Sequence, residues 1–403
     1  MCGIAGFFDA RHNLSDSDRL TNIASMLQKI RMRGPDSEGT WLCENSKLVL
    51  GHQRLAIQDL TAAGAQPMIS NCGQYVVVFN GEIYNHLELR SSLGNEVTWC
   101  GGSDTETLLR LIETKGLEAT LPLLNGMFAF AVWNRKSSEL SLCRDRFGEK
   151  PIYYGKQGSG SNTLFIFGSE LSVLKANSQF QPEICGSAVD EMIRYGCVGG
   201  EQSIYKNVKK VLPGHLITFN LNSNSMAVKE WYSIDSQVQE GKANPFMGDE
   251  RAVLDKTESL LSQAISRQLI SDVPVGAFLS GGIDSTVVVA LMQDQSASQV
   301  KTFSIGFNES GYNEAPYAAA VASHLGTDHH ELYVDAHTAI NVIPSLPEIY
   351  SEPFGDSSQV PTFLVSQMAK QSVTVSLSGD AGDEVFGGYS RYIHTEKLWK
   401  ILK

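Results

Sequence analysis

The hydrophobic pattern of this chain changes near Glu250, and this change limits the folds that the sequence can adopt. Before it, short runs rich in β-branched and aromatic residues alternate with turns, as in Gly3–Phe8, Tyr75–Phe79 and Met127–Trp133. After it, buried strand-like runs such as Val275–Leu279 alternate with helical segments. A chain of 403 residues also exceeds what one hydrophobic core usually supports. The sequence therefore predicts two domains with different architectures.

The two patterns predict different sheets. In the first half, many strands and few helices favour stacked antiparallel sheets flanked by helices. We expect the helices at Asp16–Arg31 and Thr105–Lys115. The β-α-β-α alternation of the second half predicts a parallel sheet wrapped by helices. We expect a first domain at 2–215, a polar connecting segment at 216–249 and a second domain at 250–403.

Composition excludes several classes of protein. The net charge of −12 argues against a nucleic-acid or anionic-membrane binder, because such proteins need a basic surface. We find no run of about 18 apolar residues, so no membrane span is predicted. The seven scattered cysteines form no CxxC pair and no metal-ligand spacing, so we expect no disulfide framework and no zinc site. Location in the cytoplasm fits best.

Cys2 is the first candidate for chemistry. If Met1 is removed, this residue carries both a thiol and a free α-amine, and the amine can act as the base for its own thiol. A small buried hydrophobe is the more common role of a free cysteine, so Cys2 alone favours that simpler interpretation.

Five motifs in order change this weighing. They are CGIAGFF at the start of the chain, RMRGPD at 31–36, GHQRLAIQDL at 51–60, FNGEIYN at 79–85 and GGSDTETLL at 101–109. Together they resemble the class II glutamine amidotransferases over roughly the first 190 residues. The resemblance implies an N-terminal-nucleophile fold, an αββα sandwich of two sheets between helices, with Cys2 as the nucleophile.

The residues in these motifs suit glutamine. Arg54 offers a forked donor for the carboxylate of the substrate, and Asp104 supplies an anion for its ammonium group. Asn80 and Gly81 can donate N–H groups to the oxyanion that forms when the thiolate attacks the amide. Glu82 lies beside them in the sequence and can also meet the ammonium group. An isolated Asn-Gly pair would indicate only a hairpin turn.

The resemblance extends the pocket and also includes motifs without a chemical role. It implies that backbone groups of four consecutive residues line the glutamine pocket: Leu55, Ala56, Ile57 and Gln58. The motifs at 144–151, 167–170 and 212–215 also match the family, and we interpret them as structural.

A second site is predicted at the glycine turn SGGIDS, residues 280–285, which follows a buried strand and opens a helix. Such a turn presents N–H groups and the positive end of a helix to an anion. It is not a Walker loop and resembles the PP-loop of ATP pyrophosphatases. The expected pyrophosphate contacts are Ser280, Gly281, Gly282 and Ser285. Asp284 is an expected Mg²⁺ ligand.

SGDAGDEVFGGY, residues 378–389, is the expected second half of this site, because it follows the strand Val373–Leu377. We predict that Asp383 is a second Mg²⁺ ligand. The simpler interpretation of these acids is an exposed acidic turn. The expected contacts with adenylate and adenine are Ser378, Gly379, and the backbone of Leu279 and Ile305.

The two sites together resemble the glutamine-hydrolysing asparagine synthetases, up to about Tyr392. That family implies ATP and Mg²⁺ as cofactors, L-glutamine and L-aspartate as substrates, and allows a homodimer. One departure is Asp380, which occupies a position where dedicated asparagine synthetases usually have glutamate, and we assign Asp380 to intermediate formation. The alternatives are amidation of another carboxylate, such as a sugar acid, and a non-catalytic relative. Related enzymes continue beyond Lys403, so we expect a C-terminally truncated chain that keeps glutaminase chemistry and in which synthesis is weak or absent.

Overall fold

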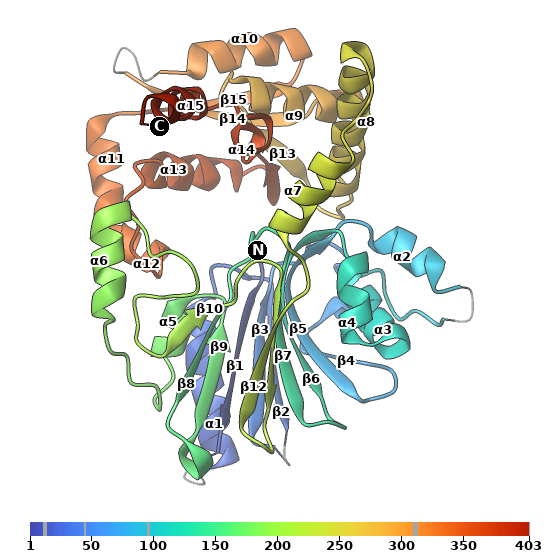
Figure 1. Ribbon diagram of the computed structural model, residues 1–403, viewed down its shortest axis with the longest axis vertical. Helices are drawn as coiled ribbons and strands as arrows, with labels where there is room; N and C mark the ends of the chain where they lie inside the picture. Colours follow the sequence, from blue (N-terminus) through green and yellow to red (C-terminus); the bar gives the residue numbers. More distant parts are fainter. Residues whose placement is uncertain (11–13, 44–45, 95–96, 309–312, 403) are drawn as a thin grey trace. The chain divides into compact units, whose positions relative to one another are not determined.

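The computed structural model describes residues 1–10, 14–43, 46–94, 97–308 and 313–402, which form two compact units (Figure 1). The first unit contains Met1–Phe246 and a later segment, Pro347–Asp356. The second contains Met247–Leu346 and Ser357–Lys403. Within the described ranges, no helix combines the length and hydropathy that a membrane span requires.

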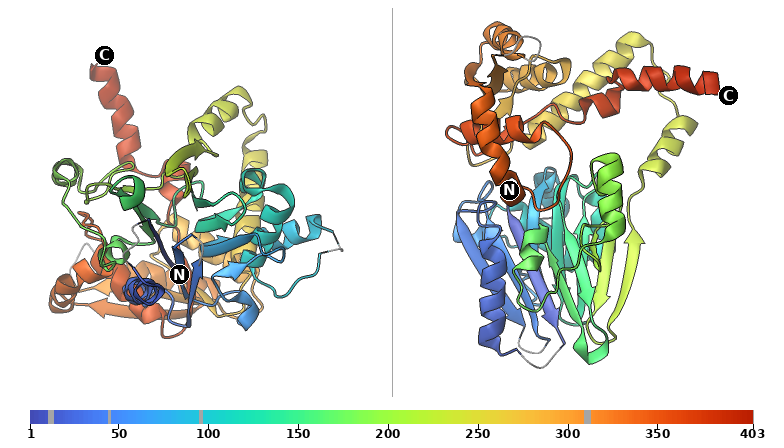
Figure 2. Two further views of the ribbon diagram at one scale, coloured as in Figure 1. Left: turned by 90° about the horizontal axis from the view of Figure 1, so that it is seen from below. Right: turned by 90° about the vertical axis from the view of Figure 1, so that its left-hand side faces the viewer.

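The first unit is built on two six-stranded antiparallel sheets (Figures 1 and 2). One sheet has the order β10-β8-β9-β1-β3-β2. Its strands are β1 (Gly3–Asp9), β2 (Ser37–Cys43), β3 (Leu48–Arg54), β8 (Tyr153–Gln157), β9 (Leu164–Gly168) and β10 (Val208–Lys210). The other has the order β12-β11-β7-β6-β5-β4. Its strands are β4 (Met68–Ile69), β5 (Tyr75–Ile83), β6 (Gly126–Asn134), β7 (Glu139–Arg144), β11 (His215–Asn220) and β12 (Ser225–Glu230).

Three apolar layers hold this unit together. The central layer lies between the sheets and takes alternate residues of each strand, such as Leu48 and Leu50 from β3 and Val76 and Val78 from β5. Helix α1 (Asp16–Gln28) packs on the outside of the first sheet, and α3 (Asp104–Lys115) packs on the second. The predicted αββα sandwich is therefore confirmed.

The first unit contains other, mostly shorter helices. They are α2 (His86–Ser92), α4 (Leu117–Thr120), α5 (Leu171–Lys175), α6 (Gly186–Tyr195), α7 (Ile234–Ala243) and most of α12 (Leu346–Ile349), with 3₁₀ turns at Ala62–Gly64, Leu121–Leu123 and Gly160–Asn162. A further 3₁₀ turn, Ile343–Ser345, belongs to the second unit. The expected connecting segment at 216–249 holds most of β11, all of β12 and α7. Because β11 is hydrogen-bonded to β7 on one side and to β12 on the other, the sandwich continues to Glu230.

The segment Pro347–Asp356 belongs to the first unit although it comes late in the chain. Glu352 forms an ion pair with Lys210, with N and O 2.6 Å apart, and accepts a hydrogen bond from the Ile204 N–H. Gly355 N–H donates to the Gly196 carbonyl at 2.6 Å. The sequence pattern gave no sign of this long-range attachment, because it depends on side chains far apart in the chain.

The second unit contains a parallel sheet with the order β15-β14-β13-β16. Its strands are β13 (Val275–Phe278), β14 (Lys301–Phe307), β15 (Asp328–Val334) and β16 (Val375–Leu377). Its helices are α8 (Glu250–Gln268), α9 (Ile283–Asp294), α10 (Ala315–Leu325), α11 (Ala336–Val342), α13 (Gln359–Ala369), α14 (Gly382–Phe386) and α15 (Ser390–Leu402). The predicted β-α-β alternation and parallel sheet are confirmed.

Candidate active sites

Strand register brings three predicted residues to one end of the sandwich. In the β1–β3 ladder Gly3 pairs with Gln53, so Cys2 and Arg54 are next to each other at its end. Successive side chains of a strand point to opposite faces, and every second residue of β1 and β3 faces the space between the sheets. Cys2 and Arg54 continue these two series, so both side chains face that space. Asn80, two residues beyond Val78 on β5, faces the same space from the other sheet. The sandwich therefore places the thiol, the guanidinium and the amide at one end, where these strands begin or finish.

The Cys2 thiol is enclosed by backbone. Its Sγ lies 3.4 Å from the Leu55 N–H and 3.5 Å from the Leu55 carbonyl oxygen. Arg33 donates from Nε to the Cys2 carbonyl at 3.0 Å and forms an ion pair with Glu170 at 2.9 Å. Burial raises the pKa of the Cys2 thiol. A base must therefore take the proton of this thiol before it can act as a nucleophile.

The amine nearest to Cys2 is buried as well. In the printed chain it belongs to Met1, and burial lowers its pKa to about 5. The cations of Arg33 and Lys150 act in the same direction. An amine in this environment is neutral at pH 7, which is the form that can accept a proton.

Asn80 is the clearest sign of a binding site. Its side chain is fully buried, and neither its amide nitrogen nor its amide oxygen has a hydrogen-bond partner among the described residues. A buried amide without a partner is costly, so such a group in a folded protein indicates an unfilled ligand position. Gly81 follows it, and a Cβ there would lie 2.1 Å from the Met127 carbonyl oxygen. Only glycine allows this close approach of β5 to β6.

Two buried carboxylates lie near the same edge. Asp104 begins α3 and accepts a hydrogen bond from the Ile83 N–H at 2.9 Å. Burial raises the pKa of Asp104 to about 6, and burial together with the Asp104 charge raises the pKa of Glu82 to about 7. Burial makes the charged form of each carboxyl group unfavourable, and a nearby cation would stabilise both charged forms. The pair therefore suits the ammonium group of an amino acid.

Arg54 is held rigidly against the loop that follows it. Its Nη1 donates to the Thr61 carbonyl at 2.9 Å, and its Nη2 donates to the Asp59 carbonyl. Gly64 packs so closely that a Cβ there would lie 2.1 Å from Nη2. Leu55–Gln58 begins this loop, and the Ala56 N–H donates to Asp36 at 2.8 Å. The loop and the guanidinium thus form one ordered wall.

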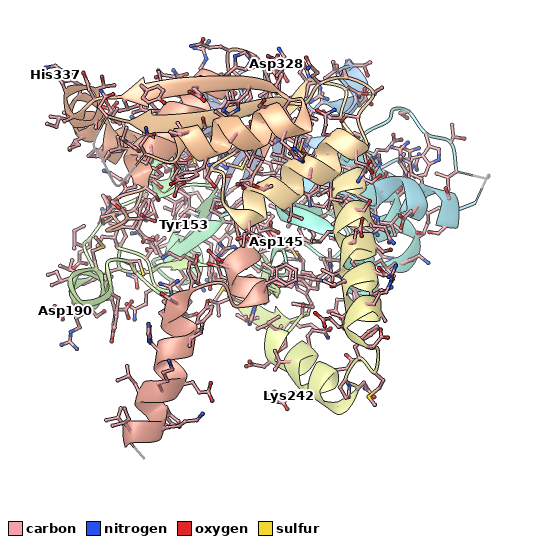
Figure 3. All side chains as sticks on the ribbon, turned by 90° about the horizontal axis from the view of Figure 1, so that it is seen from above. Asp145, Tyr153, Asp190, Lys242, Asp328 and His337 are labelled. Atoms are coloured by element: carbon pink, nitrogen blue, oxygen red, sulfur yellow. The ribbon has the colours of Figure 1, made fainter. Side chains whose placement is uncertain are left out.

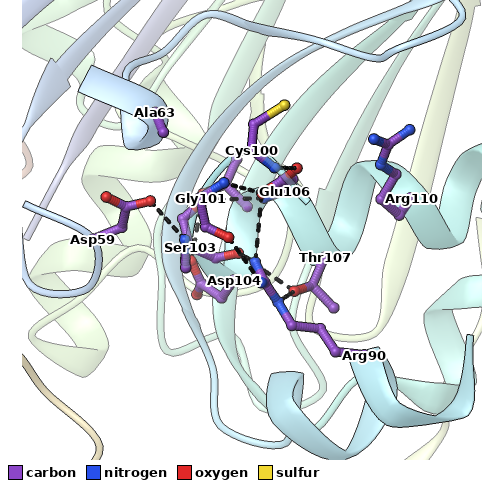
Figure 4. Close-up of polar contacts among 12 residues, drawn as sticks. Asp59, Ala63, Arg90, Cys100, Gly101, Ser103, Asp104, Glu106, Thr107 and Arg110 are labelled. Atoms are coloured by element: carbon purple, nitrogen blue, oxygen red, sulfur yellow. Dashed lines mark hydrogen bonds and ion pairs between the residues drawn. The ribbon is translucent and has the colours of Figure 1, made fainter. Parts of the chain in front are cut away.

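Arg90 organises the segment that delivers Asp104, as Figure 4 shows. Its guanidinium donates to the Gly101 carbonyl at 2.8 Å, the Ser103 carbonyl at 2.7 Å and the Thr107 hydroxyl at 2.7 Å. Glu106 accepts from the N–H groups of Cys100 and Gly101. Sequence reasoning missed Arg90, because no local pattern links α2 to this turn.

The motif at 144–151, which we expect to be structural, contains Asp145, labelled in Figure 3. This fully buried carboxylate accepts four backbone N–H groups, those of Phe128, Phe147, Glu149 and Lys150, at 2.9–3.1 Å. Arg144 donates to the carbonyls of Gly148, Lys150 and Val211 at 2.6–2.9 Å. The loop places Lys150 Nζ 3.0 Å from the Met1 sulfur.

In the second unit, the predicted PP-loop connects β13 to α9. The Ser280 and Ser285 hydroxyls lie 3.0 Å apart, and the Ser280 N–H donates to the Ser285 hydroxyl at 3.2 Å. Gly281 has a φ of +79°, and a Cβ there would lie 2.7–2.9 Å from Tyr317 and Ala318. Gly282 is the N-cap of α9. The N–H groups of the first helical turn have no partner within the helix, so they are available to an anion at the loop.

The second predicted motif lies beside this loop because of the strand order. The sheet reverses its winding at β13, which has β14 on one side and β16 on the other. Ligands of such sheets bind at the carboxyl ends of the strands where the order reverses. A Cβ at Gly379 would lie 2.6 Å from the Ser285 nitrogen, and one at Gly382 would lie 2.4 Å from Asp284 Cγ. Both glycines allow the motifs to touch.

Asp284 and Asp383 are the acids predicted to hold a divalent cation. Asp284 packs against Gly382, the residue before Asp383. Mg²⁺ commonly uses one or two carboxylates, phosphate oxygens and several waters. The described residues include no group of three or more His, Cys, Asp or Glu side chains that could hold a metal by themselves. The Asp383 carboxylate lies against Gly388, and Asp284 lies against Gly382.

Three further predicted residues belong to the second unit. Leu279 is buried, and its N–H donates to the Phe303 carbonyl at 2.9 Å. Ile305 pairs with Leu332 in the β14–β15 ladder. Asp380 is exposed and accepts a hydrogen bond from the Ser378 hydroxyl at 2.8 Å.

Comparison with protein families agrees with this division. Residues 1–232 match the glutamine amidotransferase domain, and residues 256–403 match asparagine synthase. A Methanocaldococcus jannaschii protein named as a glutamine-hydrolysing asparagine synthetase is 36% identical over all of this chain and 78% of its own length. Asparagine synthetase 1 of Bacillus subtilis is 34% identical over 97% of this chain and 59% of its own length. Asparagine synthetase B of Escherichia coli is 31% identical over all of this chain and 68% of its own length. This chain therefore belongs to the family of glutamine-hydrolysing asparagine synthetases.

Proposed function

We propose that the first unit hydrolyses L-glutamine and that the second activates a carboxylate with ATP, so that the chain forms an amide. Asn80 carries the first half of this proposal. Its amide is fully buried and unpartnered at the sheet edge that also holds Cys2. A donor fixed in this way before the substrate arrives suits an oxyanion, because no reorganisation is needed when charge develops.

Glutamine binding follows from the charges around this edge. Arg54 receives the α-carboxylate of glutamine, and the loop Leu55–Gln58 closes the pocket beside it. Asp104 and Glu82 receive the α-ammonium group. Its positive charge compensates for the burial that raises the pKa values of both carboxyl groups, and for the Asp104 charge that further raises the pKa of Glu82.

Hydrolysis begins once Met1 has been removed. The Cys2 α-amine accepts the thiol proton, and the thiolate attacks the side-chain amide carbon. The oxyanion takes hydrogen bonds from the Asn80 side chain and the Gly81 N–H. The proton then passes from the amine to the departing nitrogen, which leaves as ammonia and a thioester on Cys2. Water adds to the thioester, and the products are glutamate and the free thiol.

In the second unit, the proposed reaction needs ATP and an acceptor carboxylate. Ser280, Gly281, Gly282 and Ser285 hold the pyrophosphate part of ATP, and Ser378 and Gly379 hold the adenylate beside Leu279 and Ile305. Asp284 and Asp383 would hold Mg²⁺, which supplies charge neutralisation for the phosphates when bound. The acceptor carboxylate attacks the α-phosphorus and releases pyrophosphate. Ammonia then displaces AMP from the acyl carbon.

We infer that the acceptor is L-aspartate, which would give asparagine through β-aspartyl-AMP. The names of the relatives support this choice. The alternative is another carboxylate, such as a sugar acid. Asp380 favours it, because the shorter acid replaces an expected glutamate and is held by Ser378. Cytoplasmic location suits a chain in which all seven cysteines are free.

Glutamate release by the purified full chain tests the first half. Cys2→Ala should abolish it, whereas Cys197→Ala, at an exposed thiol, should leave it unchanged. Mass spectrometry should show that Met1 is absent from the active protein. A Cys2→Ala variant that hydrolyses glutamine at the normal rate would refute the proposal.

Release of pyrophosphate from ATP tests the second half and identifies the acceptor. Aspartate should stimulate release in both wild type and Cys2→Ala, because activation does not use the thiol. Stimulation by a hexuronic acid but not by aspartate would select the alternative. If no carboxylate stimulates pyrophosphate release while glutaminase activity is intact, the proposed synthetase activity is rejected and the glutaminase proposal stands.

A further inference from the structure

His52 is a buried residue of the first unit that the proposed chemistry does not use. It lies on β3 between Leu50 and Arg54, two residues from each, so its side chain faces the space between the sheets. The ring is only 1% exposed, and its Nε2 lies 3.0 Å from the carbonyl oxygen of Phe79 on β5. A hydrogen bond from this ring therefore joins the first sheet to the second at the residue before Asn80.

The protonation of the His52 ring follows from this contact. A carbonyl oxygen can only accept, so Nε2 carries a proton and donates it to Phe79. Burial lowers the pKa of His52 to about 3, so the ring is neutral at pH 7 and Nδ1 carries no proton. Nδ1 has no hydrogen-bond partner among the described residues. The ring is therefore held through Nε2, and its contact with the Phe79 carbonyl is a neutral hydrogen bond.

Phe79 lies where β5 loses a strand neighbour. The last pair that β4 forms with β5 is Met68 with Val77. In the same register the next pair would be Gln66 with Phe79, beyond the end of β4. There the buried Gln66 side chain takes the place of a strand, because the Phe79 N–H donates to its Oε1 at 2.6 Å. Gln66 and His52 thus complete the two backbone hydrogen bonds that β4 leaves open.

Gln66 also connects this part of β5 to the expected ammonium site. Its Nε2 donates to the Thr105 hydroxyl at 3.3 Å. That hydroxyl in turn lies 3.4 Å from Oδ1 of Asp104, to which it donates. All three side chains are buried. The residue before Asn80 is therefore held by one chain of contacts that ends at Asp104 and by another that comes from β3.

We infer that His52 and Gln66 are positioning residues for the oxyanion site, an inference that rests on the proposed glutaminase function. They hold both backbone polar groups of Phe79, so the course of the chain into Asn80 and Gly81 is fixed before glutamine binds. Donors whose direction is fixed in advance stabilise an oxyanion most, because nothing has to reorganise as charge develops. Both residues act through the two that follow Phe79 and not by contact with the substrate.

Glutamate release by the purified full chain, measured as kcat and KM, tests the inference with two variants of His52. Methionine and glutamine have similar lengths, but only glutamine has an N–H that can reach the Phe79 carbonyl. His52→Met should lower kcat about 10- to 100-fold, because the oxyanion donors lose their fixed direction. It should change KM for glutamine less than about threefold, because the oxyanion exists only after the thiolate attacks. His52→Gln should keep kcat within about threefold of the wild type.

Gln66→Met is an independent second variant, because it removes the acceptor of the Phe79 N–H. It should lower kcat at least about tenfold, and it keeps the test decisive if His52→Met does not fold. Circular dichroism and urea unfolding show which variants are folded.

Gln53→Met is the matched control. Gln53 is the next residue of β3 and is also buried, but its side chain lies on the other face of the sheet. There it donates to the Leu27 carbonyl at 3.4 Å and to Glu38 at 2.6 Å. Gln53→Met therefore also removes buried hydrogen bonds, and it should keep the kcat of the wild type.

Three outcomes would overturn the inference. The first is a folded His52→Met or Gln66→Met variant with the kcat of the wild type. The second is a loss of kcat in Gln53→Met as large as that in His52→Met, because general destabilisation would then explain both. If glutamate release by the wild type does not depend on Cys2, the proposed function is refuted and this inference with it. Release that depends on Cys2 but is unaffected by His52→Met and Gln66→Met refutes the positioning role alone.

Discussion

Replacing Glu82 by glutamine tests whether the glutamine pocket stores electrostatic strain. Glu82 is 7% exposed, and burial together with the charge of Asp104 raises the pKa of its carboxyl group from 4.5 to about 7. The folded protein therefore keeps a proton on Glu82 at pH values where the unfolded chain has released it. Glutamine has nearly the same shape and no titration, so Glu82→Gln isolates this effect.

The raised pKa of Glu82 makes the unfolding free energy of the wild type fall as the pH rises. A raised carboxyl pKa stabilises the folded state below pH 4.5, and this contribution disappears as the pH rises through about 7. Between pH 5 and pH 8.5, the wild type should lose about 2.5 kcal/mol of unfolding free energy from this group. The variant has no such loss. Relative to the wild type, Glu82→Gln should therefore gain about 2.5 kcal/mol between the two pH values.

Urea unfolding at both pH values, followed by circular dichroism, measures this difference. Glu118→Gln is the control, because Glu118 is an exposed partner of Lys229 on the same unit. An exposed pair should change stability by less than about 1 kcal/mol at either pH. A Glu82→Gln variant whose stability relative to wild type is the same at pH 5 and pH 8.5 would refute the reasoning.

Three further variants and one pH profile test the pocket and the loop. Gly81→Ala should lower the unfolding free energy by about 1–3 kcal/mol and remove most glutaminase activity, because the new Cβ would lie 2.1 Å from the Met127 carbonyl oxygen. The control in urea unfolding is Gly186→Ala, because no atom lies within 4 Å of a Cβ at Gly186. Arg90→Lys should raise KM for glutamine more than it lowers kcat, since the fork that holds the Asp104 segment is lost; an unchanged KM would contradict this. KM for glutamine should rise below about pH 6–7 as Glu82 and Asp104 take up protons, which initial rates would show. Asp284→Asn should abolish ATP-dependent pyrophosphate release and leave glutamate release intact, and loss of both would point to misfolding.

Local patterns were enough to predict many elements. β1 is one residue longer than its predicted range, Gly3–Phe8, and β6 is one residue longer at each end than its predicted range, Met127–Trp133. These segments have regular periodicity and clear end signals, so short-range physics determines them. β12 was missed because it is fully exposed and carries no alternation of apolar and polar residues. Its pairing with β11 alone makes it a strand.

The sequence by itself determined which chemical groups are available. It supplied a cysteine directly after Met1, an Asn-Gly pair, an arginine after a strand and a glycine turn between a strand and a helix, because these are properties of residue type and local order. Only the tertiary structure decided that Cys2, Arg54 and Asn80 share one edge, since strand register and alternation set which way each side chain faces. The same holds for the environment of Glu82, because a pKa depends on burial and on charges that the fold brings from elsewhere in the chain.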